Sequence, residues 1–131
     1  MPRRLTGIWL GRRPYGAVLG LQRALHAARA RGEGHDVVLL VEHDPVITLG
    51  RSARAEHVLT AGAALAAAGI EVFAVERGGD VTLHGPGQLV AYPIVDLCPD
   101  RRDVRRYVND LLEAMRQTVL DHGIAAGTVP G

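Results

Sequence analysis

The sequence contains no lysine and a single cysteine, Cys98, among its 131 residues. All 15 basic residues are therefore arginines, and 14 acidic residues leave a net charge of +1, so no nucleic-acid partner is expected. One cysteine excludes an internal disulfide and favours a reducing, cytoplasmic setting. Because no apolar stretch approaches the roughly 20 residues of a membrane span and no signal-peptide core follows the start, we expect no membrane association.

The length and composition fit one folded domain, residues 1–131. Hydrophobic residues make up 47% of the sequence and charged residues 22%, which is ordinary for a globular protein. Four arginines cluster near the end of the chain, among several aspartates. A solvated helix face is the simpler interpretation of this cluster, and a docking surface for an acidic protein is the alternative. The residues are Arg101, Arg102, Arg105 and Arg106.

Apolar spacing and breaker residues predict alternating helices and strands. Helices are expected at 15–31, at 61–68 with Thr60 as its cap, and from an Asp103 cap to Gly123, with Met115 on an apolar stripe that belongs in the core. Strands are expected at 37–41, 46–49, 70–75, 81–84 and 89–95. The last two flank Gly85-Pro86-Gly87 and are predicted to pair as a hairpin.

The predicted fold class is α/β of the α+β type, a mixed β-sheet with helices packed on it. The closing residues, Gly127 to Gly131, read as a loop that leads onward after a possible strand at Ile124. We therefore expect the domain to be incomplete at its carboxyl end.

The segment RGGDVTLHGPGQ, residues 77–88, is the strongest candidate for a ligand site. Gly78 and Gly79 allow a sharp turn whose amides can bind a ligand, and Arg77 offers planar donors for a carboxylate, phosphate or thioester carbonyl. His84 is expected at a strand end, where it can donate to or accept from an acyl group. A simple glycine-rich hairpin is the alternative. The phosphate-loop pattern needs a lysine, and the dinucleotide pattern GxGxxG is absent.

The longer segment RGGDVTLHGPGQLVAYP resembles the signature of the octanoyltransferase family, which belongs with the biotin and lipoate protein ligases. LLVEHDPVITLGR, residues 39–51, resembles a second family motif, and RRYVNDLLEAM followed by HGI resembles the helix after the signature. The Tyr15, Gln22 and Leu25 pattern is similar to its first helix. The resemblance covers nearly the whole chain and implies the catalytic-domain fold of those ligases.

Members of this family move an octanoyl or lipoyl group from acyl carrier protein to a lysine of a lipoyl domain, through a thioester on an enzyme cysteine. The resemblance implies these partners here, including lipoyl domains of 2-oxoacid dehydrogenases or the glycine cleavage H protein, and no cofactor. At position 83 the family more often has an aromatic residue than leucine. The implied acyl and thioester pocket comprises Arg77, Gly78, Gly79, Asp80, Val81, Thr82, Leu83 and His84.

No catalytic residue is expected within these 131 residues. The family's nucleophilic cysteine and its activating lysine lie beyond the matched segment, and thioester exchange needs a thiolate that a nearby cation favours. Cys98 does not align with that cysteine, and Asp96 and Asp100 beside it oppose thiolate formation. The resemblance therefore implies an amino-terminal fragment that lacks turnover.

Two further residue groups have weaker interpretations. Glu42, His43 and His57 could suggest a metal or acid–base site, but their spacing is not that of a helical metal site, so a structural role beside the pocket is favoured and no metal is expected. Thr48 and Thr82 are expected to fill strand positions.

Two other functions stay open for the chain. An ATP-dependent lipoate or biotin ligase shares the general fold, although such a reaction relies on lysine to hold phosphate. A non-catalytic acyl-binding module is the second alternative.

Overall fold

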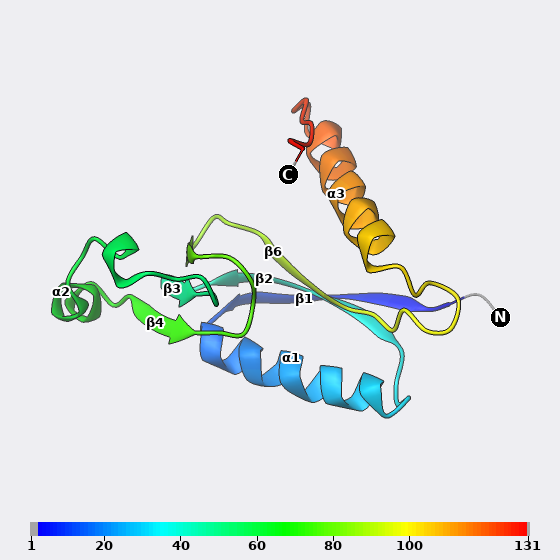
Figure 1. Cartoon of the computed structure of the whole chain (residues 1–131), viewed down its shortest axis with the longest axis horizontal. Helices are drawn as coiled ribbons and strands as arrows, with labels where there is room; N and C mark the ends of the chain where they lie inside the picture. The colour runs from blue at the N-terminus through cyan, green and yellow to red at the C-terminus, as the bar shows by residue number, and fades with distance from the viewer. Residues whose placement is uncertain (1–2, 131) are drawn as a thin grey trace. The chain divides into compact units, whose positions relative to one another are not determined.

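The computed structural model describes residues 3–130, which form two compact units divided between residues 95 and 96. Figure 1 labels their helices and strands. The first unit contains β1 (Leu5–Arg13), α1 (Tyr15–Ala30), β2 (Asp36–His43), β3 (Val46–Leu49), η1 (Ala55–His57), α2 (Gly62–Ala67), β4 (Glu71–Ala74), β5 (Val81–His84) and β6 (Val90–Ile94). The second unit contains α3 (Val104–Asp121).

The first sheet has the strand order β1-β2-β6, with β1 parallel and β6 antiparallel to β2. Side chains along β2 alternate between buried and half-buried, so one face of the central strand is fully covered. Val37, Leu39 and Ile94 form the buried cluster, and α1 packs against β6 on this side through Leu25 (Figure 1). The amphipathic helix predicted at residues 15–31 is thus confirmed.

The second sheet has the strand order β4-β3-β5, with β4 parallel and β5 antiparallel to β3. Its strands coincide with the predicted apolar runs. The expected mixture of parallel and antiparallel pairs is confirmed, although the strands are divided between two sheets.

The predicted hairpin between β5 and β6 is wrong, because β5 pairs with β3 and β6 pairs with β2. The chain crosses from the first sheet to the second after β2, and it crosses back after β5. Four residues separate Val41 from Val46, whereas five separate their partners His84 and Val90. This extra residue, together with a proline in each crossing that cannot donate to a ladder, interrupts the pairing.

β1 was not predicted from the sequence. Gly7 and Gly11 interrupt the apolar alternation that marks a strand, and arginines end the segment. β1 forms because β2 offers it a parallel partner, with Gly7 aligned to Val38 and Trp9 to Leu40. Tertiary pairing therefore determines this strand more than its own sequence does.

The two later helices differ in how well their caps were predicted. Asp103 caps α3 as expected, since its carboxylate accepts a hydrogen bond of 2.9 Å from the amide of Arg106. The cap predicted at Thr60 is wrong: Ala61 occupies the cap position of α2 and supplies no side-chain hydrogen bond. Within the second unit no residue of α3 is buried, and Met115, expected in a core, is exposed.

None of the helices within residues 3–130 combines the length and apolar character that crossing a bilayer requires.

Gly50 lets the segment after β4 lie directly against the end of β3. The amides of Gly50, Arg51 and Ser52 donate to the carbonyls of Asp80, Arg77 and Gly79 at 2.8, 3.0 and 3.0 Å. A Cβ atom at position 50 would lie 2.3 Å from the carbonyl oxygen of Gly79 and 2.9 Å from that of Gly78. Only glycine fits there without moving the backbone of the glycine-rich segment.

Substitution of Gly50 tests this close approach. We expect Gly50→Ala to lower the free energy of unfolding by about 2 kcal/mol or more, because backbone carbonyls must move. Gly20→Ala is the matched control, since a Cβ there meets nothing within 4 Å, and it should raise stability by about 0.5–1 kcal/mol in the helix interior. Urea unfolding followed by circular dichroism measures both, and equal effects of the two changes would contradict the account.

Substitution of Asp103 tests the cap of α3. We expect Asp103→Ala to cost the first turn of the helix about 1 kcal/mol, because the amide of Arg106 loses its acceptor. Amide hydrogen exchange should then speed up at Arg106 and its neighbours. Asp110→Ala, in the body of the same helix, is the control, and identical exchange in both variants would count against the cap.

Candidate functional site

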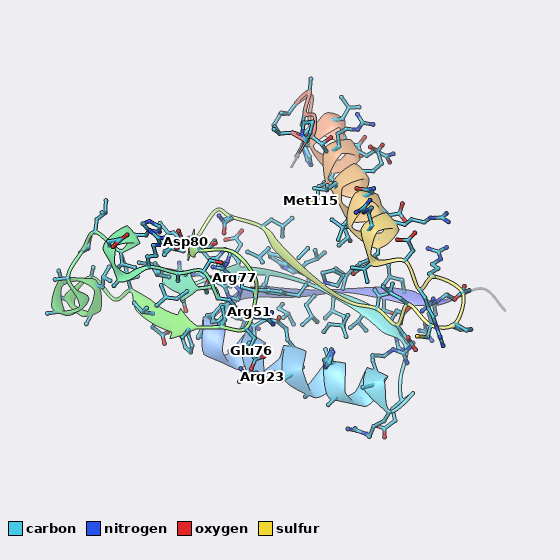
Figure 2. The ribbon with its side chains drawn as sticks, viewed as in Figure 1. Arg23, Arg51, Glu76, Arg77, Asp80 and Met115 are labelled. Carbon is cyan, nitrogen blue, oxygen red and sulfur yellow. The ribbon has the colours of Figure 1, made fainter. Side chains whose placement is uncertain are left out.

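The eight residues predicted to line a pocket lie in one continuous stretch of the first unit. Arg77 to Asp80 form the loop after β4, and Val81 to His84 are β5 itself. Figure 2 labels Arg77 and Asp80 in this loop, with Arg51 beside Arg77. Along β5, Val81 aligns with Leu49 and Thr82 with Thr48.

The guanidinium group of Arg77 is directed into the protein. It donates to the side chain of Thr48 at 2.8 and 3.2 Å and to its carbonyl at 2.9 Å. It also donates to the carbonyls of Asp80 at 3.1 Å and Gly78 at 2.9 Å. Thr48 lies in β3, as expected, and its buried hydroxyl also accepts hydrogen bonds from Arg77. Through these bonds Arg77 holds the loop in place. A direct contact between Arg77 and a ligand stays a prediction.

The amides of Gly78 and Gly79 are hydrogen-bond donors of this loop that remain available. Neither amide donates a hydrogen bond to any of residues 3–130, and both residues are exposed. Gly79 has a φ of +86°, which favours glycine. Two adjacent amides held by a fixed loop can bind an oxygen with partial negative charge.

Asp80 faces the segment that follows β3. Its carboxylate is paired with Nδ1 of His57 and accepts a hydrogen bond of 3.4 Å from the amide of Arg54. Both side chains of the pair are partly exposed, so their pairing adds little stability. His57 thus lies beside the predicted pocket residues. No group of three potential metal ligands occurs in the described part of the chain.

His84 ends β5, at the point where the chain crosses between the sheets. Its Nδ1 is paired with the side-chain oxygen of Gln88, and its ring packs against the ring of His43 at a centroid distance of 5.9 Å. Leu83, on the strand just before it, is 61% exposed and offers apolar surface. Beyond the turn, the amide of Gly87 donates to the carboxylate of Glu42 at 3.3 Å.

His43 is fully buried at the other crossing, which agrees with the structural role expected for it. Its Nδ1 donates to the carbonyl of Arg13 at 3.2 Å, and its Nε2 accepts from the hydroxyl of Tyr92 at 2.7 Å. Its ring also contacts Tyr15 edge-on at 5.2 Å. Burial lowers the pKa of His43, and the nearby His84 acts in the same direction, so the imidazole is kept neutral.

The two tyrosines around His43 are also kept in their neutral form. Burial raises the pKa of Tyr92, and Tyr15 nearby adds to this effect. Burial likewise raises the pKa of Tyr15, although the positive charges of Arg77 and Arg23 act against it. Tyr15 further packs on Phe73 of β4 at 5.1 Å, so this cluster joins α1 to both sheets.

Sequence reasoning missed three residues that shape the site. From the sequence, Gly50 only follows the strand predicted at 46–49, Gln88 only ends the motif at 77–88, and Tyr92 only lies in the strand predicted at 89–95. Gln88 follows a Gly-Pro-Gly turn four residues after a histidine, and that spacing could have suggested a side-chain contact across the turn. The roles of Gly50 and Tyr92 depend on pairing between distant segments.

Cys98 lies in the second unit and is exposed. Its amide donates to the carboxylate of Asp96 at 2.9 Å, which puts a negative charge close to the residue.

Known proteins resemble the chain over nearly its whole length. It is 50% identical over 126 residues to an octanoyltransferase of Myxococcus xanthus. The aligned region covers 96% of the chain and 35% of that relative. It is 47% identical over 129 residues to an octanoyltransferase of Chloroflexus aurantiacus. Here the aligned region covers 98% of the chain and 58% of that relative. The chain therefore spans less than two thirds of the length of these relatives.

The fold is also found in a solved structure. A protein of T. acidophilum, described as a candidate lipoate protein ligase, matches 98% of the chain and 52% of its own length, with a TM-score of 0.68 and 19% identity. At that identity the similarity concerns the fold alone, and it confirms the predicted fold class. The family model of the lipoyl protein ligase A/B catalytic domain matches residues 14–130. The chain thus belongs to the lipoyl protein ligase A/B catalytic domain family.

Proposed function

We propose that these 131 residues form the acyl-thioester-binding part of an octanoyltransferase. In this proposal the whole protein transfers an octanoyl or lipoyl group from acyl carrier protein to a lysine of a lipoyl domain. The similarity to octanoyltransferases over 96% and 98% of the chain supports it. The acceptors are lipoyl domains of 2-oxoacid dehydrogenases or the glycine cleavage H protein, the setting is the cytoplasm, and no cofactor takes part.

The observation that carries the proposal is the pair of amides at Gly78 and Gly79, which donate to no described residue. A thioester carbonyl gains negative charge as a nucleophile attacks it, and fixed amide donors stabilise that charge. In this proposal Arg77 holds the loop that carries these amides in place through hydrogen bonds to the buried Thr48. The exposed Leu83 provides apolar surface for the acyl chain on the same strand as His84.

The proposal assigns no turnover to the 131 residues alone. Transfer by thioester exchange needs a thiolate and a cation that favours it, and the sequence has no lysine. The one cysteine, Cys98, does not align with the family's nucleophile, and its amide donates to the carboxylate of Asp96. The nucleophile is therefore expected in the part of the matched relatives' length that this chain does not cover.

Binding of a soluble octanoyl thioester, octanoyl-pantetheine, tests the assigned site. We expect His84→Ala to weaken binding to the 131-residue chain about tenfold, the loss expected for removing one close polar contact and its packing. His26→Ala, an exposed histidine of α1, is the matched control and should leave binding unchanged. Isothermal titration calorimetry measures the affinities. Equal affinity of the two variants would remove His84 from the site.

Activity is tested by joining the chain to the remaining carboxyl-terminal part of the Chloroflexus aurantiacus octanoyltransferase. The joined protein should transfer octanoate from octanoyl-acyl carrier protein to a lipoyl domain without ATP, and the 131-residue chain should not. Mass spectrometry of the lipoyl domain reads out the transfer. Transfer by the chain alone, or transfer that requires ATP, would contradict the proposal.

A further inference from the structure

The side chain of Gln88 has an orientation that its neighbours determine. Its Nε2 lies 3.5 Å from the carbonyl of Leu83, which can only accept a hydrogen bond. The nitrogen of the amide faces Leu83, and the oxygen faces the ring of His84. The contact with the carbonyl of Leu83 thus favours the orientation in which the Gln88 side-chain oxygen lies next to His84.

The orientation of Gln88 in turn determines the tautomer of His84. An amide oxygen can only accept, so Nδ1 of His84 carries the proton in the pair with Gln88. In the neutral ring the other nitrogen, Nε2, then has a lone pair and no proton. Nε2 makes no hydrogen bond to any of residues 3–130.

The ring of His84 is also restrained from its other side. His43 packs on it at a centroid distance of 5.9 Å, and His43 is itself held by Arg13 and Tyr92. A ring flip of His84 would break the pair with Gln88 and disturb this packing. Gln88 and His43 therefore restrain both the tautomer and the orientation of the His84 ring.

We propose that Gln88 is a positioning residue that holds His84 in its Nδ1–H tautomer, so that Nε2 stays available as a hydrogen-bond acceptor for a bound acyl compound. This inference rests on the proposed function, because it concerns the same site. Gly78 and Gly79 offer donors in the loop, and His84, at the end of β5, offers an acceptor.

An acceptor at Nε2 suits the proposed transfer. When an amine attacks a thioester, a nitrogen–carbon bond forms, the carbon–sulfur bond breaks, and one proton must leave the nitrogen. The proton ends on the departing sulfur, which leaves as a thiol, and Nε2 of His84 can accept a hydrogen bond from the nitrogen. The opposite tautomer would present a proton to the amine and could not accept its hydrogen bond.

The tautomer itself can be measured without any ligand, by ¹⁵N NMR of the histidine rings at a pH where they are neutral. The wild-type chain should show Nδ1 of His84 protonated and Nε2 unprotonated. Gln88→Met, which keeps the length of the side chain but removes the strong acceptor, should shift His84 toward the Nε2–H form. Gln88→Glu keeps an acceptor and should restore the wild-type form. Gln117→Met, on α3, is the matched control.

The consequence for binding is tested with two uncharged octanoyl compounds. Octanamide carries N–H donors next to its carbonyl, and S-methyl thiooctanoate does not. We expect the wild-type chain to prefer octanamide by about three- to tenfold, the usual range for one hydrogen bond. Gln88→Met should abolish this preference and Gln88→Glu should keep it, while the circular dichroism spectra of both stay unchanged.

The possible outcomes separate this inference from the proposed function. An Nε2–H tautomer in the wild-type chain, or an unchanged tautomer in Gln88→Met, would overturn the role of Gln88 even if the thioester binds. A preference for octanamide that persists in Gln88→Met would also overturn it. If neither compound binds, the proposed function fails, and the NMR result still decides whether Gln88 sets the tautomer.

Discussion

The loop that follows β4 can lie against the end of β3 only because position 50 has no side chain. Three backbone hydrogen bonds of 2.8–3.0 Å join the two segments, and a Cβ atom at Gly50 would collide with two carbonyl oxygens. Arg77 stabilises the same loop by donating hydrogen bonds to the buried Thr48. The carbonyls of the loop are used in this contact, whereas the amides of the exposed Gly78 and Gly79 donate to none of residues 3–130. The binding properties proposed for the loop follow from this contact.

The second constraint is the crossing of the chain between the two sheets. β2 and β5 both end where the chain passes from one sheet to the other. A histidine occupies the last position of each strand. The two crossings lie side by side, so the buried His43 packs against the partly exposed His84. One ring is neutral and fully bonded within the protein, whereas the other has a free ring nitrogen. The two crossings thus place a buried, fully bonded ring against a ring whose second nitrogen remains available.

The sequence predicts local features of this protein well and distant pairing poorly. The apolar stripe of α1, the strand at Val46 to Leu49 and the Asp103 cap depend on neighbouring residues, and each is confirmed. The hairpin across Gly85-Pro86-Gly87 was wrong because a break within paired strands and a turn between them use the same breaker residues. The glycine-rich loop was recognised from its composition, but the inward direction of Arg77 depends on Thr48, which is 29 residues away.

The central claim is that the loop amides at Gly78 and Gly79 receive the carbonyl of an acyl thioester. The most direct measurement is a ¹H–¹⁵N NMR titration of the chain with S-methyl thiooctanoate, alongside octyl methyl sulfide, which has no carbonyl. The account predicts that the Gly78 and Gly79 amide signals move downfield and saturate with the thioester but not with the sulfide. Signals that stay in place at both glycines while the thioester shifts other residues of the first unit would contradict it.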